Sequence, residues 1–197
     1  FKEIESPQGI GQLASVLAQR GVEGSVPSLL HQLTRSKDAQ ARQEIWTAIG
    51  ALASTDDLKE VLSHLQIEQE PEQHIAAQAL ATILQKDKDP SLYLNAIVEV
   101  TQNTALSEFT RAAAIESLGI IGSPKAFEEL SKFLKNDNAK LRGAAAIAAR
   151  YWPNGAPLDA LQQLIAAEFQ SAVRLSAIQS FAQLTAKSAP FSQDQIK

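Results

Sequence analysis

The sequence predicts an all-α protein, an α-α superhelix (solenoid) of about five helix pairs that follow one N-terminal helix. The first observation is internal repetition. Five nine-residue segments, each placed in the second helix of a pair, align without gaps at residues 42–50, 73–81, 111–119, 142–150 and 174–182. Their first residues, the lead positions, are 31, 38, 31 and 32 residues apart, a short period for two-helix repeats. No stretch alternates apolar and polar residues over strand length, so no sheet is expected.

The second observation is that the aligned segments share columns of apolar or small side chains. The column three after the lead holds Ile45, Ala76, Ala114, Ala145 and Ala177. The column four after the lead holds Trp46, Ala77, Ile115, Ala146 and Ile178. The column seven after the lead holds Ile49, Leu80, Leu118, Ala149 and Phe181. Residues three and four positions apart share one helical face, so these columns predict a buried stripe. The column six after the lead is always small, which lets neighbouring helices approach closely: Ala48, Ala79, Ser117, Ala148 and Ser180.

A shorter amphipathic helix is predicted before each second helix. Proline is tolerated in the first turn of a helix, because its missing N–H would have no partner there. The residues that open these first helices are Pro27, Asp57, Pro90, Pro124 and Pro157. Side chains that can cap a second helix stand four positions before a lead arginine, at Asp38, Ser107 and Asn138.

This arrangement of a proline-led first helix, a polar cap, a lead arginine and an Ala-rich second helix resembles HEAT repeats. The resemblance is strongest over residues 108–122, which read Glu-Phe-Thr-Arg-Ala-Ala-Ala-Ile-Glu-Ser-Leu-Gly-Ile-Ile-Gly. Armadillo repeats are the near alternative, but they carry three helices over a longer period. One departure is Gln73, which stands where the other segments have Arg, ahead of the longest spacing. We expect the extra residues to lengthen the next first helix or the turn at residues 98–105.

The resemblance implies one HEAT-like repeat domain over residues 1–197. We expect its repeats at approximately residues 24–54, 55–86, 89–122, 123–154 and 155–186. The end of a solenoid exposes core surface unless a polar repeat caps it. Neither end of this sequence shows such a cap, so we expect the chain to be a fragment of a longer protein.

Composition excludes several classes of function. The formal net charge is -4 and charged residues make up 20% of the chain, a balance that argues against nucleic acid as the partner. There is no cysteine, so disulfides, thiolate metal ligands and cysteine nucleophiles are excluded. No apolar run approaches the roughly 20 residues that span a bilayer. We therefore expect a soluble protein; the absence of both Cys and Met favours an extracytoplasmic over a cytoplasmic location.

No residue pattern indicates catalysis, a cofactor or a metal ion. The three histidines, His31, His64 and His74, do not form a His-Glu-x-x-His pattern or share a carboxylate at helical spacing. The adjacent acids Asp56 and Asp57 are interpreted as residues that open a helix, where negative charge stabilises the helix dipole. The sequence therefore predicts a protein that is not an enzyme.

The lead arginines at positions 42, 111, 142 and 174 have two interpretations. They could form a ladder of cations for an acidic partner, or they could bond to the cap of their own or a neighbouring repeat. We favour the structural interpretation, because the HEAT resemblance implies it.

We predict a scaffold or protein-interaction module that binds a protein or peptide partner on the face of its second helices. Stacked repeats present an extended concave surface for such partners. The outward positions on that face are Gln43, Thr47, His74, Gln78, Glu116, Arg150, Tyr151 and Gln179. Arg150 and Tyr151 replace small or apolar residues, and an Arg beside an aromatic is typical of interface hot spots. The alternative, by analogy with two HEAT-like families, is a role like that of bilin lyases or alkyl-base DNA glycosylases.

Overall fold

The computed structural model describes residues 6–188, and within that range it contains helices and no strand. The helices are α1 (Pro7–Gln19), α2 (Val26–Arg35), α3 (Ala39–Leu52), α4 (Leu58–Ser63), α5 (Glu70–Leu84), α6 (Leu94–Gln102), α7 (Glu108–Ile121), α8 (Pro124–Leu134), α9 (Ala139–Ala149), α10 (Leu158–Ala167) and α11 (Ser171–Ser188). Two 3-10 turns, Glu23–Ser25 and Pro90–Tyr93, precede α2 and α6. The predicted all-α class is confirmed.

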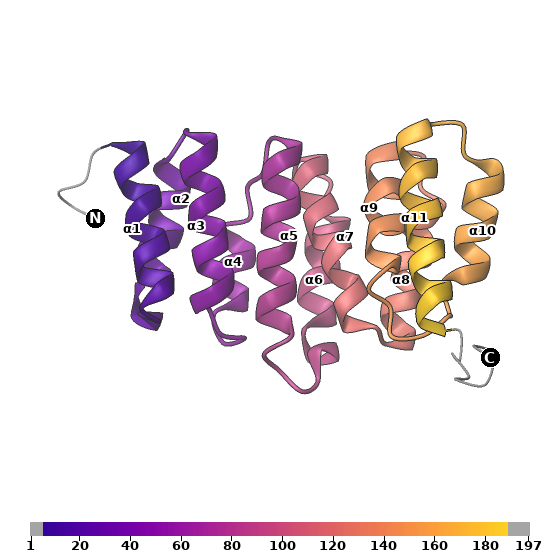
Figure 1. The fold of residues 1–197 in the computed structure, drawn as a ribbon, viewed down its shortest axis with the longest axis horizontal. Coiled ribbons are helices and arrows are strands. Elements are labelled where there is room, and N and C mark those ends of the chain that lie inside the picture. Colours follow the sequence, from indigo (N-terminus) through magenta and orange to yellow (C-terminus); the bar gives the residue numbers. More distant parts are fainter. Residues whose placement is uncertain (1–5, 189–197) are drawn as a thin grey trace, which may run out of the picture.

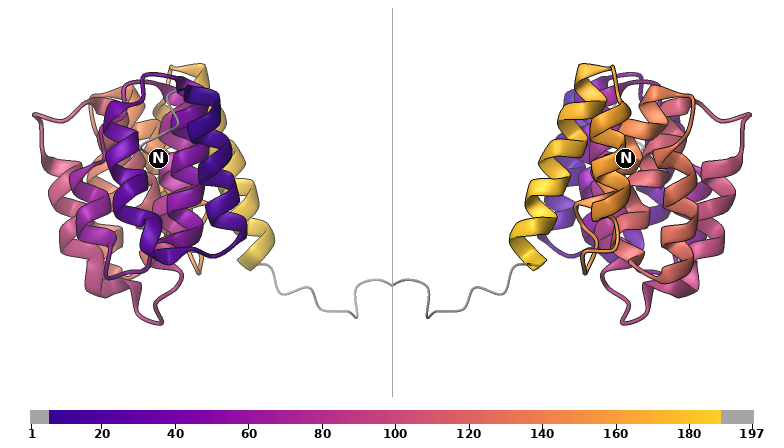
Figure 2. Two further views of the ribbon diagram at one scale, coloured as in Figure 1. Left: turned by 90° about the vertical axis from the view of Figure 1, so that its left-hand side faces the viewer. Right: turned by 90° about the vertical axis from the view of Figure 1, so that its right-hand side faces the viewer.

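The helices stack in two rows, as Figures 1 and 2 show. The second helices α3, α5, α7, α9 and α11 form one row, in which each packs on the next. The first helices α2, α4, α6, α8 and α10 lie behind them. The leading helix α1 belongs to the row of second helices, because it packs against α3. Residues 6–188 therefore form a solenoid of five helix pairs with a leading helix, as predicted.

The predicted buried columns form the core along the whole row of second helices. Every residue of the column three after the lead has no exposed surface, and the small column six after the lead is at most 4% exposed. Two residues of α11 depart from their columns: Ile178 is 45% exposed while Ile115 is fully buried, and Phe181 is only partly buried. Ile178 and its neighbour Leu175 lie on α11, whose outer face has no further helix among the described residues to cover it. Burial of this stripe thus requires the adjacent repeat.

The predicted caps hold the starts of three second helices. The side chains of Asp38, Ser107 and Asn138 accept hydrogen bonds from backbone N–H groups of the first turns of α3, α7 and α9 at 2.8, 3.1 and 2.9 Å. Pro124 lies in the first turn of α8, as predicted, whereas Pro157 is the residue just before α10. These local contacts fix where each helix begins, and so which residues reach the face of the row.

The predicted location of the extra residues ahead of α6 is wrong. They form the loop and 3-10 turn at residues 85–93, rather than a longer first helix or a longer turn at 98–105. The loop is held by its own polar side chains. Asp87 accepts bonds from the Asp89 N–H at 3.0 Å and from the Tyr93 hydroxyl at 2.7 Å. Such Asx turns compete with helix, which explains why the insertion stays irregular.

The row of second helices is closest where glycine faces a small residue. A Cβ atom on Gly119 of α7 would overlap the backbone carbonyl of Ala148 on α9. One on Gly50 of α3 would lie 2.8 Å from the Cα of Ala79 on α5. Because the obstacle is backbone in both places, no side-chain rotation could make room. Gly143 differs, since a Cβ there would meet only Val173 at an ordinary 3.7 Å.

We expect Gly119→Ala to lower the free energy of unfolding by about 1–3 kcal/mol, because α7 and α9 must separate. Gly143→Ala is the matched control: it adds the same methyl group to a neighbouring second helix. It should raise stability by about 0.5–1 kcal/mol through helix propensity alone. Thermal unfolding followed by circular dichroism measures both. Equal effects of the two variants would contradict the close approach.

Candidate partner-binding groove

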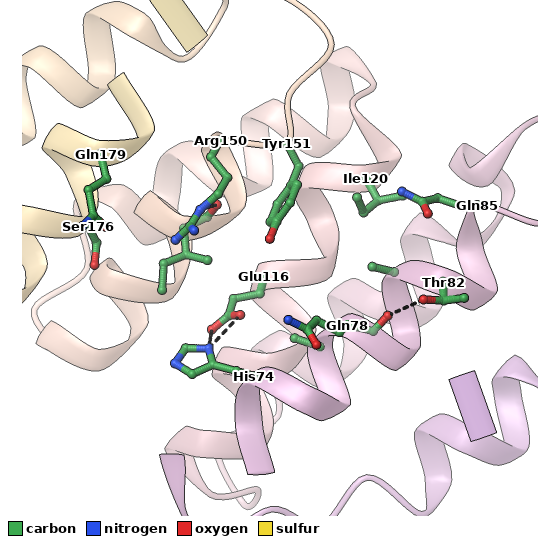
Figure 3. A pocket seen from close by; sticks show the side chains of 13 residues that line it. His74, Gln78, Thr82, Gln85, Glu116, Ile120, Arg150, Tyr151, Ser176 and Gln179 are labelled. Carbon is green, nitrogen blue, oxygen red and sulfur yellow. Dashed lines mark hydrogen bonds and ion pairs between the residues drawn. The ribbon is translucent and has the colours of Figure 1, made fainter. Parts of the chain in front are cut away.

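A groove of about 590 Å³ crosses four consecutive second helices, α5, α7, α9 and α11. Because α5 and α11 line the same groove as the two helices between them, the row is concave here (Figure 3). Its thirteen lining residues, which define the groove below, are His74, Ala77, Gln78, Ala81, Thr82, Gln85, Glu116, Ile120, Ile147, Arg150, Tyr151, Ser176 and Gln179. Small and aliphatic side chains alternate with uncharged amides and hydroxyls, and the charged groups are few.

Six of the eight residues predicted to contact a partner line this groove: His74, Gln78, Glu116, Arg150, Tyr151 and Gln179. The other two, Gln43 and Thr47, lie on α3 outside it. The Thr47 hydroxyl bonds locally to the Gln43 carbonyl at 2.9 Å, and Thr47 is exposed. Six predicted residues, from four repeats, thus lie together in one site, whereas Gln43 and Thr47 of α3 lie outside it.

Glu116 was expected to point outward, but it is buried, with only 6% of its surface exposed. Its carboxylate accepts a bond from the Gln73 side-chain amide at 2.6 Å and lies 3.1 Å from His74 Nδ1. Both partners come from α5, so this helix covers the Glu116 carboxylate. No sequence pattern predicts this contact, because the partners are more than forty residues apart and no short motif joins them.

The His74 imidazole shares this cluster and is partly exposed to the groove. Its hydrogen bond to the Glu116 carboxylate raises the pKa of His74 above its ordinary value, while partial burial opposes the shift. The charge of Glu70 adds to the increase in the pKa of His74 and that of Lys140 lowers it. The floor of the groove therefore favours an imidazolium–carboxylate pair.

Arg150 and Tyr151 form the end of the groove beside α11. Arg150 stands eight after its lead, where the other repeats have Gly or Ala. It caps the C-terminus of α9, and its guanidinium lies 5.7 Å from the centre of the Tyr151 ring. Its Nε donates to the Ile147 carbonyl at 3.2 Å, and its two Nη atoms have no partner in the described residues. Figure 3 shows both side chains extending into the open groove.

A second hollow, of about 320 Å³, continues the groove toward the N-terminal ends of the second helices. It shares His74, Ile147 and Ser176 with the groove, so the two form one continuous surface. Lys140 of α9 lies here, 4.2 Å from the ring centre of Phe109 and 3.9 Å from the Glu70 carboxylate. This end of the surface therefore carries a cation that already has an acidic neighbour.

The repeats that form the groove are similar to repeats of known proteins. The family model of HEAT repeats matches residues 73–150, from the lead position of α5 to Arg150, the residue that caps the end of α9. This part of the chain consists of HEAT repeats. The HEAT segment supplies ten of the thirteen residues of the groove, the exceptions being Tyr151, Ser176 and Gln179.

One solved structure similar to the whole solenoid is a designed armadillo repeat protein. The two share 17% sequence identity, with a TM-score of 0.46, over 90% of this chain and 91% of that chain. No curated protein matches the sequence.

Three of the four lead arginines, Arg42, Arg111 and Arg142, have the structural role favoured from the sequence, although their partners are not the capping side chains. Arg42 bonds to the carboxylate of Glu72 at 2.6 Å and to the carbonyls of Leu33 and Gln66. Because Glu72 is 2% exposed and also accepts the Trp46 indole N–H at 2.9 Å, it ties α5 to α3.

Two further lead arginines also bond within the solenoid. Arg142 bonds to the carboxylate of Glu168 at 2.7 Å, and this contact lowers the pKa of Glu168. The Arg111 Nε bonds to the Thr101 carbonyl at the end of α6 at 2.9 Å. Arg174 is exposed on α11. Arg42 and Arg142 thus tie neighbouring repeats together, Arg111 ties the two helices of its own repeat, and no lead arginine lines the groove.

No metal centre is formed within residues 6–188, where no group of three or more His, Asp or Glu lies close enough to hold an ion. No helix in that range is long and apolar enough to cross a membrane. His31 is exposed and His64 ends α4, where its Nδ1 lies 3.0 Å from the Glu60 carbonyl. The groove is therefore the candidate functional site within residues 6–188.

We expect Arg42→Ala to destabilise the solenoid strongly, because it leaves the Glu72 carboxylate buried without its cation. Removal of one partner of such a pair costs about 3 kcal/mol or more. For a chain of this length the melting temperature should fall by about 6 °C or more. The control is Arg174→Ala, which removes an exposed arginine from the same column and should change stability by less than about 0.5 kcal/mol. Equal melting temperatures of the two variants would refute the structural role.

The His74–Glu116 pair should make stability depend on pH. A pKa that is raised on folding adds stability below the ordinary pKa of histidine, and this is lost as the pH rises through the raised pKa. The difference in melting temperature between wild type and His74→Gln should therefore be larger at about pH 5.5 than at about pH 8.5. His31→Gln, which changes an exposed histidine on α2, should show no such difference. A His74→Gln effect that is constant across this range would contradict the pairing.

Proposed function

We propose that this protein is a non-catalytic interaction module that binds a protein or peptide segment in the groove of its second helices. The observation that supports it best is the continuity of the groove over four repeats. A site for one small molecule needs only a few convergent side chains, whereas a hollow that runs across successive repeats suits an elongated ligand. HEAT-repeat solenoids commonly use such surfaces to bind proteins.

The chemistry of the groove suits a peptide main chain. Its walls carry amide and hydroxyl groups, which can both donate and accept hydrogen bonds, at Gln78, Thr82, Gln85, Ser176 and Gln179. Its floor carries alkyl groups that can cover apolar side chains. Neighbouring helices lie about 8–10 Å apart, and an extended chain advances about 3.3–3.6 Å per residue, so four helices accommodate about eight residues.

The two alternative functions have less support from the groove. A DNA glycosylase needs a strongly basic surface, but the charged groups of the groove are His74, Arg150 and the acidic Glu116. For a bilin-lyase-like role the structure offers no group that distinguishes a tetrapyrrole from a peptide. A visible absorbance change on addition of a bilin would test that role directly.

The test is a selection of random twelve-residue peptides against the wild-type protein, followed by measurement of Kd for the enriched peptides. The double variant Gln78→Trp, Gln179→Trp fills the groove from both walls, through two exposed residues. It should abolish binding. Gln162→Trp makes the same change at an exposed residue of α10, outside the groove, and should leave Kd unchanged. Failure to enrich peptides, or binding that survives in the double variant, would refute the proposal.

A further inference from the structure

Arg150 differs from the lead arginines in having no carboxylate. Arg42 and Arg142 each bond to a buried glutamate within the solenoid. Arg150, in contrast, donates only through Nε to a main-chain carbonyl, and its Nη atoms have no partner in the described part of the chain. It is also half-buried in a concave surface, where a cation is less hydrated than on a convex one. The groove thus contains an uncompensated positive charge.

The acidic residues near the groove cannot neutralise this charge, because they are already engaged. Glu116 bonds to Gln73 and His74, and Glu70 lies beside Lys140 at the other end of the surface. A second cation adds to the field at Arg150. The Lys187 ammonium of α11 donates to the Arg150 carbonyl at 2.9 Å, and it forms no ion pair within residues 6–188. Among residues 6–188, this end of the groove is therefore positive and has no counter-charge.

The position of Arg150 in its repeat places the guanidinium in the groove. The same position holds Gly50 and Gly119 in α3 and α7, where it touches the next second helix. The helix α9 ends at Ala149, so Arg150 leaves the helix and lies along the Tyr151 ring instead. An arginine that rests on an aromatic face keeps the N–H groups at its edge free for a planar acceptor.

From these observations we infer that Arg150 and Tyr151 form a carboxylate-binding subsite, and that the groove selects peptides with an acidic side chain at this point. The inference rests on the proposed function and names its ligand. The two Nη groups of Arg150 donate to the two oxygens of an Asp or Glu side chain, in the fork geometry that arginine forms with carboxylates. The Tyr151 hydroxyl, which extends into the same space, is a further donor. The other residues of the peptide contact the uncharged walls.

Charge complementarity favours a peptide over a nucleic acid as the bearer of the anion. A phosphate backbone presents a charge at every nucleotide and requires cations that repeat along the groove. Here the cation of α5, His74, is paired with Glu116, and the walls between it and Arg150 are neutral. One unpaired guanidinium suits one carboxylate in an otherwise uncharged segment.

The test starts from the peptides selected against the wild-type protein at about pH 7. They should share one Asp or Glu within a segment of about eight residues. Replacement of that residue by Asn or Gln should weaken binding about tenfold or more, which corresponds to the loss of one charged bond. Arg150→Ala should cause a similar loss and leave the melting temperature unchanged, because Gly or Ala stands at this position in the other repeats. Arg174→Ala, which removes an exposed arginine of α11 outside the groove, is the matched control.

A double-mutant cycle then establishes the pairing. The acid-to-amide peptide should bind Arg150→Ala and wild type equally, and Arg150→Glu should bind a peptide with Arg or Lys in place of the acid. The inference is wrong if the enriched peptides lack a common acid, or if the two losses are additive. In either case binding that is still blocked by Gln78→Trp, Gln179→Trp leaves the proposed function standing. If that double variant binds normally, the proposed function fails as well. Displacement of the peptide by a single-stranded oligonucleotide of equal length would overturn the choice of ligand.

Discussion

The fold depends on one packing constraint: the apolar stripe of each second helix is covered only when the next repeat lies against it. The contrast between Ile115, fully buried in the middle of the row, and Ile178, almost half exposed on α11, shows this directly. Close approach is possible because glycine in one helix meets a small residue in the next, as Gly119 meets Ala148. Curvature and groove follow from that contact, since the helices that touch in the row are also the walls and floor of the site.

The polar contacts between repeats depend on whether the lead residue is Arg or Gln. This difference explains why a buried hydrogen bond lies on the floor of the groove. Where a lead arginine is present, as at Arg42, the tie between repeats lies at the ends of the helices, on a buried carboxylate and main-chain carbonyls. The repeat of α5 has Gln73 instead, and its amide bonds to Glu116 on α7. In that repeat a tie between neighbouring second helices lies on the floor of the groove, in addition to the bonds of Ser107 and Thr110 to Ile67 at the edge of the solenoid.

The sequence predicted the features that depend on local periodicity. The buried columns, the capping side chains and the paired helices all follow from residues within one repeat. It did not predict features that depend on how neighbouring repeats meet. Glu116 occupies an outward position on its own helix, but α5 covers it. Glu72 and Glu168, the partners of Arg42 and Arg142, each lie in the repeat that follows the arginine. The conformation of the insertion before α6 is set by the side-chain bonds of Asp87. A pattern read along one helix contains no information on such contacts.

The Gln73–Glu116 bond joins two helices, α5 and α7, that also line the proposed binding site. Of the side chains that join α5 to α7 there, His74 and Glu116 line the groove, and the inserted loop at residues 85–93 follows α5 and leads into α6. If the proposed peptide binds one angle between α5 and α7 better than another, its affinity and that angle are thermodynamically coupled.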